Sequence, residues 1–418
     1  MDAVFDAQFR TIKDTFARRG IEIAAAYTPA GDVDYVYRVG RLLTVGGDDN
    51  LSRLDRLLPG VRRADEEEQP RGDLVVLATD RLERGRLAVP EVLDVIDADL
   101  GDDNPGQRGE PQFTPVHVTH VTRLCPAVEP EVPGGRPDQP WPPPRPATQP
   151  AGDVLIGVSD TGLLEHLDPA RYPWLAGVGG EPDLLDPPGP SGLPHIPQFT
   201  GHGTFIAGVA RCFAPGAGVF VNDHFSESGA ELETVIVGKL EDLARRQPPP
   251  DIINLSAGTY TRNAWTSLGF ESFHTRNPGV TLVAAAGNDG TDRPFYPAAY
   301  DWTISVGALG PDERHRAWFS NHGDWVDVYA LGEGMINAYA TGEYVYQEPP
   351  KRPARQIFDG MARWDGTSFS APLVAGLIAA RMARTGESSA DAAEAVLTFA
   401  RGQEIQGLGA ALLSGDQP

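Results

Sequence analysis

The serine at position 368 has the setting that a nucleophile of acyl transfer needs. It follows a polar stretch and precedes the apolar run 373–380, which predicts that a helix begins there. The first backbone N–H groups of a helix lack intrahelical partners, and together with the helix dipole they favour negative charge. Such donors can stabilise the oxyanion that forms when a hydroxyl attacks an acyl group. Serine is also a common helix N-cap, so Ser368 alone does not indicate a catalytic site.

Three other polar residues stand where apolar runs end or begin. Asp160 closes the run 154–159, and Asn288 follows the run 281–286. His202 lies between two glycines at the start of a stretch with helical spacing. Continuous apolar runs are typical of parallel strands covered on both faces, and open α/β sheets place their sites at the carboxyl ends of such strands. Taken singly, each of these residues is equally well read as a turn or structural residue.

Taken together, the four residues resemble a known family. The chain contains DTG, HGT, GN and GTS motifs in the order in which the subtilisin-like serine endopeptidases (subtilases) carry them, at residues 160–162, 202–204, 287–288 and 366–368. The resemblance covers about residues 152–413. It implies that Ser368 attacks the scissile carbonyl and that His202 transfers the proton. It also implies that Asp160 orients the imidazole, while Asn288 and the Ser368 backbone N–H bind the oxyanion.

The same resemblance implies a substrate cleft with two walls. Residues 251–258 are similar to the strand that pairs with an extended peptide in the family. The walls would be made of small residues, which implies a roomy slot for the side chain before the cut: Ser256, Ala257, Gly258, Ala285, Ala286 and Gly287. Asp289 follows the oxyanion residue, and its carboxylate could favour Lys or Arg in the substrate. An exposed turn aspartate is the commoner case.

The chain departs from the family pattern at three places. Ser370 stands where a small apolar residue is usual, and Phe205 stands where many members have a second histidine. Between Gly208 and Pro215 there is no room for the longer loop that wraps calcium in many secreted members. The residues that remain offer no side-chain oxygen, whereas calcium needs six to eight oxygen ligands. We therefore expect no calcium at this place, and we assign no metal and no cofactor.

The length of 418 residues exceeds one ordinary domain. We expect an N-terminal α+β domain over residues 1–125, a proline-rich linker over 126–150 and a subtilisin-like peptidase domain over 151–418. The peptidase domain should be an α/β fold with a central, mostly parallel sheet flanked by helices. Prolines at the density of residues 126–150 cannot join a helix or central strand and give an extended linker. A polyproline ligand for a partner is the alternative.

The N-terminal region has the element order of a ferredoxin-like domain. An amphipathic helix carrying Phe5, Phe9, Ile12 and Phe16 comes first. Strands are expected at residues 35–39, near 61–62, at 74–78 and at 116–121, with helices at 50–58 and 89–96. This β-α-β-β-α-β order is similar to the inhibitory pro-domain of subtilases. An independent recognition domain is the competing interpretation. His117 and His120 point to opposite faces of the last strand, so we assign them no metal.

Two further stretches read as surface loops that frame the cleft, residues 183–197 and 342–358. The N-terminal sequence lacks the pattern of a secretory signal, and no run approaches the ~20 apolar residues needed to span a bilayer. The two cysteines, Cys125 and Cys212, do not suggest a disulfide framework, although a bridge stays open. We expect cytoplasmic residence. The net charge of −23 disfavours nucleic acid as a partner.

The leading hypothesis is a cytoplasmic serine endopeptidase that acts on polypeptides and is restrained or targeted by its own N-terminal domain. A narrower version is a maturation protease dedicated to one cognate peptide. The rival from another class is a non-catalytic peptide-binding scaffold that kept the fold. The presence of all four residues argues against it, because a scaffold needs neither a nucleophile nor a base.

Overall fold

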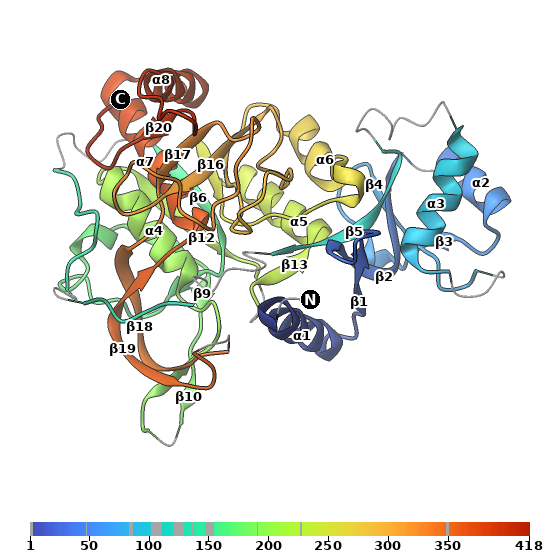
Figure 1. Cartoon of the computed structure of the whole chain (residues 1–418), viewed down its shortest axis with the longest axis horizontal. Coiled ribbons are helices and arrows are strands. Elements are labelled where there is room, and N and C mark those ends of the chain that lie inside the picture. Colours follow the sequence, from blue (N-terminus) through green and yellow to red (C-terminus); the bar gives the residue numbers. More distant parts are fainter. Residues whose placement is uncertain are drawn as a thin grey trace.

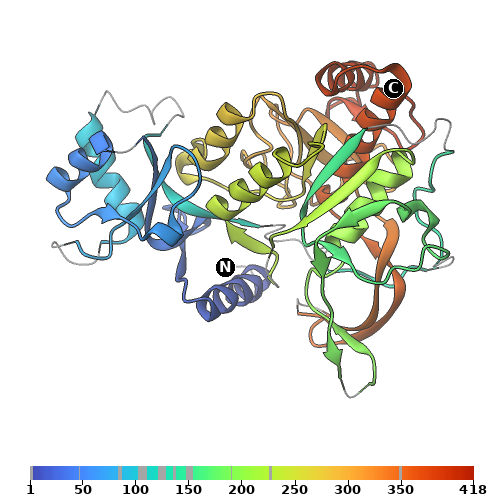
Figure 2. The same cartoon turned by 180° about the vertical axis from the view of Figure 1, so that it is seen from behind.

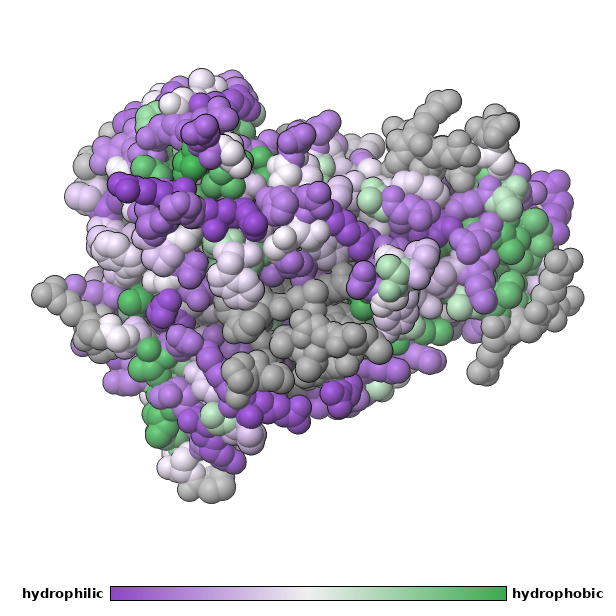
Figure 3. Space-filling model, viewed as in Figure 1, coloured by the Kyte–Doolittle hydropathy of each residue, from purple (hydrophilic) through white to green (hydrophobic). Residues whose placement is uncertain are grey.

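Two large β-sheets organise the chain, and Figures 1 and 2 show them side by side. The computed structural model describes residues 3–46, 48–82, 87–101, 111–120, 129–134, 138–146, 154–189, 191–225, 228–347 and 351–418. One sheet lies in the C-terminal part of the chain and is parallel, and the other lies mainly in the N-terminal part and is antiparallel. Figure 3 shows a mostly hydrophilic face with scattered apolar patches, in keeping with the high net charge.

The parallel sheet has eight strands, in the order β20-β17-β16-β15-β14-β6-β12-β8. Its central strands are the apolar runs of the sequence, buried on both faces as such runs predict. The strands are β6 (Leu155–Asp160), β8 (Val178–Gly180), β12 (Gly218–Asp223), β14 (Ile252–Leu255), β15 (Thr281–Ala285), β16 (Thr303–Leu309), β17 (Val328–Leu331) and β20 (Ala411–Leu412).

Helices cover both faces of this sheet, as the α/β prediction requires. On one face, α4 (His202–Phe213), α7 (Thr367–Thr385) and α8 (Ser389–Arg401) share one apolar core with Ile252 and Val283 of the sheet. On the other face, α5 (Glu233–Ala244) and α6 (Leu268–Arg276) pack on Ile253 and Leu282. Successive residues of a strand thus face opposite cores, because the side chains of a β-strand alternate between its two faces.

The two stretches predicted as surface loops contain strands of one small sheet, joined by turns. Its order is β10-β11-β18-β19, with β10 (Asp186–Pro188), β11 (Pro194–Ile196), β18 (Met335–Val345) and β19 (Arg355–Trp364). Strands β18 and β19 form a long antiparallel hairpin, and β11 pairs in parallel with β18. We call this sheet the arm; it projects from the peptidase region at the lower left of Figure 1. The glycine and proline content of these stretches indicates loops, but the pairing of β11 with β18, which lies far away in the sequence, makes them part of a sheet.

The N-terminal elements follow the predicted order. They are α1 (Ala3–Arg18), β1 (Ile23–Tyr27), β2 (Val33–Val45), α2 (Asp48–Leu57), β3 (Arg62–Arg63), η1 (Glu66–Glu68), β4 (Leu74–Ala78), α3 (Val89–Leu100) and β5 (Phe113–His120). The strands pair antiparallel in the order β5-β2-β4-β3, with β1 added to β2. This confirms a ferredoxin-like arrangement, extended by α1 and β1.

Strand β13 (Ala230–Leu232), from the C-terminal part, pairs antiparallel with β5 and becomes the edge of the N-terminal sheet. The apolar core on that side of the sheet is shared, because Phe16 and Val116 pack together with Leu232 and Leu268. The opposite side is covered by α2 and α3 through Leu54, Val92 and similar residues. The two regions are therefore joined by continuous pairing and packing, and the predicted domain limits stay a prediction.

The described part of the predicted linker lies on the arm. Glu131 pairs antiparallel with Arg363 at the end of β19, and Trp141 pairs antiparallel with Ile336 at the start of β18. Four backbone hydrogen bonds of 2.7–2.9 Å make these two contacts. Residues 129–134 and 138–146 are therefore paired, through one residue each, with the two edges of the base of the arm, and the linker itself stays a prediction. Residues 126–128, 135–137 and 147–150 lie outside the described residues.

Candidate active site

The predicted base and its carboxylate partner meet at the carboxyl end of β6. Asp160 ends that strand with none of its surface exposed, and His202 opens α4. The Nδ1 atom of His202 lies 2.8 Å from Oδ1 of Asp160. The helix can begin at His202 because the residue before it is Gly201, whose φ of 87° is favourable only for glycine. The contact fixes the imidazole tautomer with Nε2 on the far side.

A buried network that the sequence reasoning missed supports this contact. Asp183 Oδ2 accepts hydrogen bonds from Thr161 Oγ1 at 3.0 Å and from the backbone N–H of Gly201 at 2.7 Å. Thr161 Oγ1 in turn accepts from the backbone N–H of Gly203 at 3.0 Å. The network therefore ties the end of β6 to both neighbours of His202. Burial raises the pKa of the Asp183 carboxyl to about 7.

Ser368 is the second residue of α7, in the position predicted for it. Pro372 lacks an N–H, so it cannot bond the Ser368 carbonyl four residues earlier. Ser256 Oγ donates to this carbonyl instead, at 2.9 Å. The Ser368 hydroxyl itself donates to the carbonyl of Ser256, at 3.4 Å. Within the described residues it makes no hydrogen bond to His202, so the predicted nucleophile and the predicted base are not hydrogen-bonded to each other.

Asn288 is held against the start of α7. Its Oδ1 accepts from both the backbone N–H and the hydroxyl of Thr367, each at 2.8 Å. With the oxygen fixed in this way, the Nδ2 atom lies on the side of Gly366, two residues before the nucleophile. The backbone turns sharply before Asn288 because Gly287 has a φ of 98°. The structure thus brings an amide donor and the predicted nucleophile to the same helix end.

The predicted substrate strand continues from β14 and is already paired. Gly258 exchanges two backbone hydrogen bonds with His120, the last residue of β5, at 2.9 and 3.1 Å. A Cβ on Gly258 would lie 2.4 Å from the ring of Phe295, so the position is closed to larger residues. Ser256, Ala257 and Gly258 follow β14, while Ala285 ends the neighbouring strand β15 and Ala286 and Gly287 follow it. All six predicted wall residues are thus at one sheet edge.

Asp289 is engaged within the protein. Its Oδ2 accepts from the Tyr260 hydroxyl at 2.6 Å, and its backbone N–H donates to Asn321 at 3.0 Å. Tyr260 also receives a hydrogen bond from Asn321 Nδ2, at 3.0 Å. The carboxylate therefore belongs to a packed polar cluster behind the slot. Its role in selecting a basic side chain stays a prediction.

Aromatic rings surround the imidazole. The ring centroid of Trp364 lies 5.2 Å from that of His202, and that of Phe369 lies 5.3 Å away. Phe205, the residue that departs from the family pattern, lies 4.5 Å from Phe369 and 5.8 Å from Trp364. All three rings are almost fully buried. Sequence reasoning found Phe205 but assigned it no function, and it missed Trp364.

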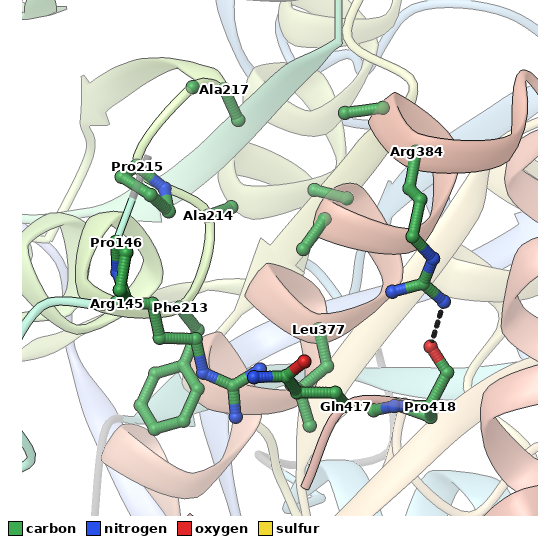
Figure 4. A pocket seen from close by; sticks show the side chains of 14 residues that line it. Arg145, Pro146, Phe213, Ala214, Pro215, Ala217, Leu377, Arg384, Gln417 and Pro418 are labelled. Carbon is green, nitrogen blue, oxygen red and sulfur yellow. Dashed lines mark hydrogen bonds between the residues drawn. The ribbon is translucent and has the colours of Figure 1, made fainter. Parts of the chain in front are cut away.

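Cavities outside the cleft involve other residues. A cavity of about 150 Å³ lies between the carboxyl end of α4 and the middle of α7, where Phe213 and Leu377 line it. Figure 4 shows Arg145 beside Phe213, and Arg384 bonded to the carbonyl of Pro418. None of the four predicted catalytic residues lines it. Another cavity, of about 440 Å³, is lined by Thr161, Asp183 and other residues next to Asp160.

Cys212 is a free, buried thiol in α4, and burial raises its pKa to about 12. Cys125 lies outside the described residues. No group of three or more His, Cys, Asp and Glu side chains that could hold a metal ion occurs within the described ranges. His117 Nδ1 instead contacts Glu233 Oε2, at 2.5 Å. In the part of the chain that the structure describes, no helix is both long and apolar enough to cross a membrane.

The model of the Subtilase family matches residues 151–407, which contain all four residues and both walls. The chain belongs to the Subtilase family. Among curated relatives, the thermophilic serine proteinase of Bacillus sp. (strain AK1) is 30% identical over 214 residues, covering 48% of this chain and 46% of that protein. Thermitase of Thermoactinomyces vulgaris is 29% identical over 267 residues, covering 61% of this chain and 82% of thermitase.

The match spans about half the length, or less, of the first curated relatives. Among solved structures, fervidolysin from Fervidobacterium pennivorans aligns with a TM-score of 0.54 at 16% identity, over 91% of this chain and 62% of that one. This likeness extends the shared fold beyond the peptidase region. It confirms the predicted fold class, a central parallel sheet with helices preceded by an antiparallel α+β region.

Proposed function

We propose that this subtilase is a serine endopeptidase in which Ser368 is the nucleophile, His202 the general base and Asp160 its orienting partner. Asn288 Nδ2 and the backbone N–H of Ser368 stabilise the oxyanion. The observation that carries the proposal is the convergence of these groups at one sheet edge. His202 is bonded to Asp160 at 2.8 Å, and Asn288 is bonded at 2.8 Å to the residue before Ser368.

The reaction follows from this geometry. The Ser368 hydroxyl turns from the Ser256 carbonyl toward His202 Nε2, which takes its proton as Oγ attacks the scissile carbonyl. Catalytic hydrogen bonds are often long in the absence of substrate and tighten in the complex. The imidazolium then gives its proton to the leaving amine, and water repeats the cycle on the acyl-enzyme. Asp160, without solvent exposure, stabilises the positive ring at short range.

A serine-directed fluorophosphonate probe tests the chemistry. We expect wild-type protein to be labelled and to hydrolyse a denatured polypeptide, whereas Ser368→Ala is not labelled and loses hydrolysis by at least about 10³-fold. Ser370→Ala, two residues along the same helix, is the matched control and keeps the label. Unlabelled wild-type protein with a native circular dichroism spectrum would instead support the peptide-binding scaffold.

We further propose that the N-terminal region restrains the enzyme by occupying its substrate strand. Strand β5 lies where a substrate peptide would pair, because it exchanges hydrogen bonds with Gly258 on one side and with β13 on the other. Thr259 Oγ1 adds a hydrogen bond to the carbonyl of Val118, at 2.9 Å. An extended polypeptide cannot add to the same edge while β5 is in place.

Charged contacts support a restraint that holds and can be released. Ion pairs join the two regions along the whole contact: Arg19–Glu231, Arg71–Asp242, Arg262–Asp94, Arg262–Asp97, Arg276–Asp73 and Arg293–Asp34. At the centre, the fully buried His117 contacts the fully buried Glu233. Interfaces within a chain that are rich in charge resemble those of transient complexes. This favours a pro-domain-like inhibitor over a rigid structural base.

Incubating the protein and sequencing any new N-terminus distinguishes an inhibitory pro-domain from a recognition domain. Self-cleavage between about residues 122 and 152, absent from Ser368→Ala, supports the pro-domain interpretation. A chain that stays intact and hydrolyses polypeptides at full rate supports a recognition domain. Cytoplasmic residence stays a prediction, which fractionation of the source cells would test.

A further inference from the structure

Trp364 joins the arm to the catalytic helix. It ends β19, and only two residues separate it from Thr367, where α7 begins. Both of these residues are pinned. Asp365 Oδ1 accepts from the backbone N–H of Gly334 at 2.5 Å, and the N–H of Gly366 donates to the carbonyl of Gly332 at 2.7 Å. The indole and the hydroxyl of Ser368 therefore belong to one rigid segment.

The imidazole of His202 belongs to a different element, and one hydrogen bond orients it. The bond from Nδ1 to Asp160 fixes one corner of the ring, while Nε2 has no hydrogen bond to Ser368. The remaining restraint on the ring plane comes from its aromatic neighbours. Trp364 meets it at an interplanar angle of 81° and Phe369 at 55°. These rings limit the rotation that would carry Nε2 away from the nucleophile.

Two further rings back the indole. Phe205, one turn along α4 from His202, packs on both Trp364 and Phe369. Tyr339 of the arm packs on Trp364 at 5.6 Å and also lies against Gly201, where a Cβ would come within 2.8 Å of its ring. Trp364 is 2% exposed, so its indole is packed among protein atoms on nearly all sides. Phe205 from α4 and Tyr339 from the arm therefore both support the indole in its contact with His202.

We infer that Trp364, backed by Phe205, is a positioning residue that sets the plane of the His202 imidazole for proton exchange with Ser368. The inference rests on the proposed function. Because indole and nucleophile share one rigid segment, the ring plane is set relative to the nucleophile itself. The role affects the chemical step and leaves the substrate strand at Gly258 untouched. The loss should therefore appear in kcat and not in KM.

The experiment compares variants of the full chain on a quenched peptide that the wild type cleaves. Trp364→Leu removes the ring wall and should lower kcat about 10- to 100-fold, since small misplacements of a catalytic group have effects of this size. Trp364→Phe keeps a ring and should stay within about threefold of wild type. Phe358→Leu is the matched control. It removes a fully buried ring of the same arm, which packs on Tyr339 and not on His202.

A selective fall of kcat in Trp364→Leu, with KM unchanged and with rescue by phenylalanine, supports the inference. Equal losses in Trp364→Leu and Phe358→Leu at matched thermal stability overturn it, because both would then reflect arm packing. If Trp364→Leu does not fold, Phe205→Leu decides, since it loosens the wall without touching the imidazole contacts. A normal kcat there refutes the inference. Wild-type protein without hydrolysis overturns the proposed function instead.

Discussion

The two large sheets of this molecule reach the same substrate strand in opposite ways. The parallel sheet supplies Asp160, Gly258 and Asn288 from the ends of adjacent buried strands, and its cores are apolar. The antiparallel N-terminal sheet arrives from outside, and arginine–carboxylate pairs line its contact with the peptidase region. An apolar core with Leu232 and Leu268 also joins the two regions, so the contact is mixed in chemistry. Under the proposed function, the first arrangement positions the catalytic groups, whereas the second restrains access to them.

The comparison predicts that changes at the parallel sheet reduce the chemical step, while changes at the charged contact release activity. The first change to test is Asn288→Ala. One oxyanion donor is typically worth about 10²–10³ in kcat, so we expect a loss of that size with little change in KM, measured on a short peptide. Thr367→Ser keeps the hydroxyl that anchors Asn288 and should retain most of the activity. A normal kcat in Asn288→Ala would remove that side chain from the mechanism.

The next prediction concerns Asp183, on the peptidase side of the comparison, and the pH dependence of stability. Its carboxyl has a pKa raised to about 7 in the folded protein against 3.8 for the ordinary group, because it is buried. The folded state therefore holds this proton more tightly than the unfolded state, so stability should fall as pH rises from about 4 to 7. The contribution is on the order of 4 kcal/mol. Urea unfolding across this range should show the slope, and Asp183→Asn should flatten it; an unchanged slope contradicts the assignment.

Arg262→Ala tests the charged contact. The side chain is 10% exposed and bonds Asp94 and Asp97 of α3, each at 2.6 Å. Losing it removes the arginine partner of both carboxylates and should weaken the restraint by about 1–2 kcal/mol, which is roughly a tenfold rise in the initial rate of fluorophosphonate labelling. Arg53→Ala breaks an exposed pair with Asp99 inside the N-terminal region and should change nothing. A slower reaction in Arg262→Ala would argue that the N-terminal region assists catalysis.

The smallest effect is expected at Ser370. Its hydroxyl donates to the carbonyl of Ala330 at 3.1 Å, away from Ser368 and His202. Ser370→Ala should cost about 1 kcal/mol of stability, as a buried hydrogen bond does, and should leave kcat within about twofold. Thermal unfolding and peptide hydrolysis check both values. A large fall in kcat would instead show that Ser370, two residues after Ser368, contributes to catalysis.

The sequence predicted the residues that local signals identify. Apolar runs located β6 and β15, while the resemblance to the subtilase motifs located the strand at residues 251–258 and brought the four polar residues together. Asp183 could not be found in this way, because its burial depends on a hydrogen bond to Gly201 from a different part of the chain. Residues 183–197 and 342–358 of the arm were predicted as two loops, and what the sequence did not reveal is that β11 and β18, far apart in the chain, pair in one sheet.

Trp364 illustrates the same limit within the site. Its position next to the nucleophile was visible in the sequence, but its contact with His202 depends on the closure of α4 against α7. The predicted order of N-terminal elements was correct because helices and strands there alternate with clear periodicity. What periodicity could not reveal was that β13 completes the N-terminal sheet from the other half of the chain.

His120 and Gly258 belong to one chain, and so do Glu131 and Arg363, which form a second backbone bridge. Contacts within one chain form at an effective concentration that dilution does not lower. Under the proposed restraint, dilution alone would therefore not free the edge at Gly258.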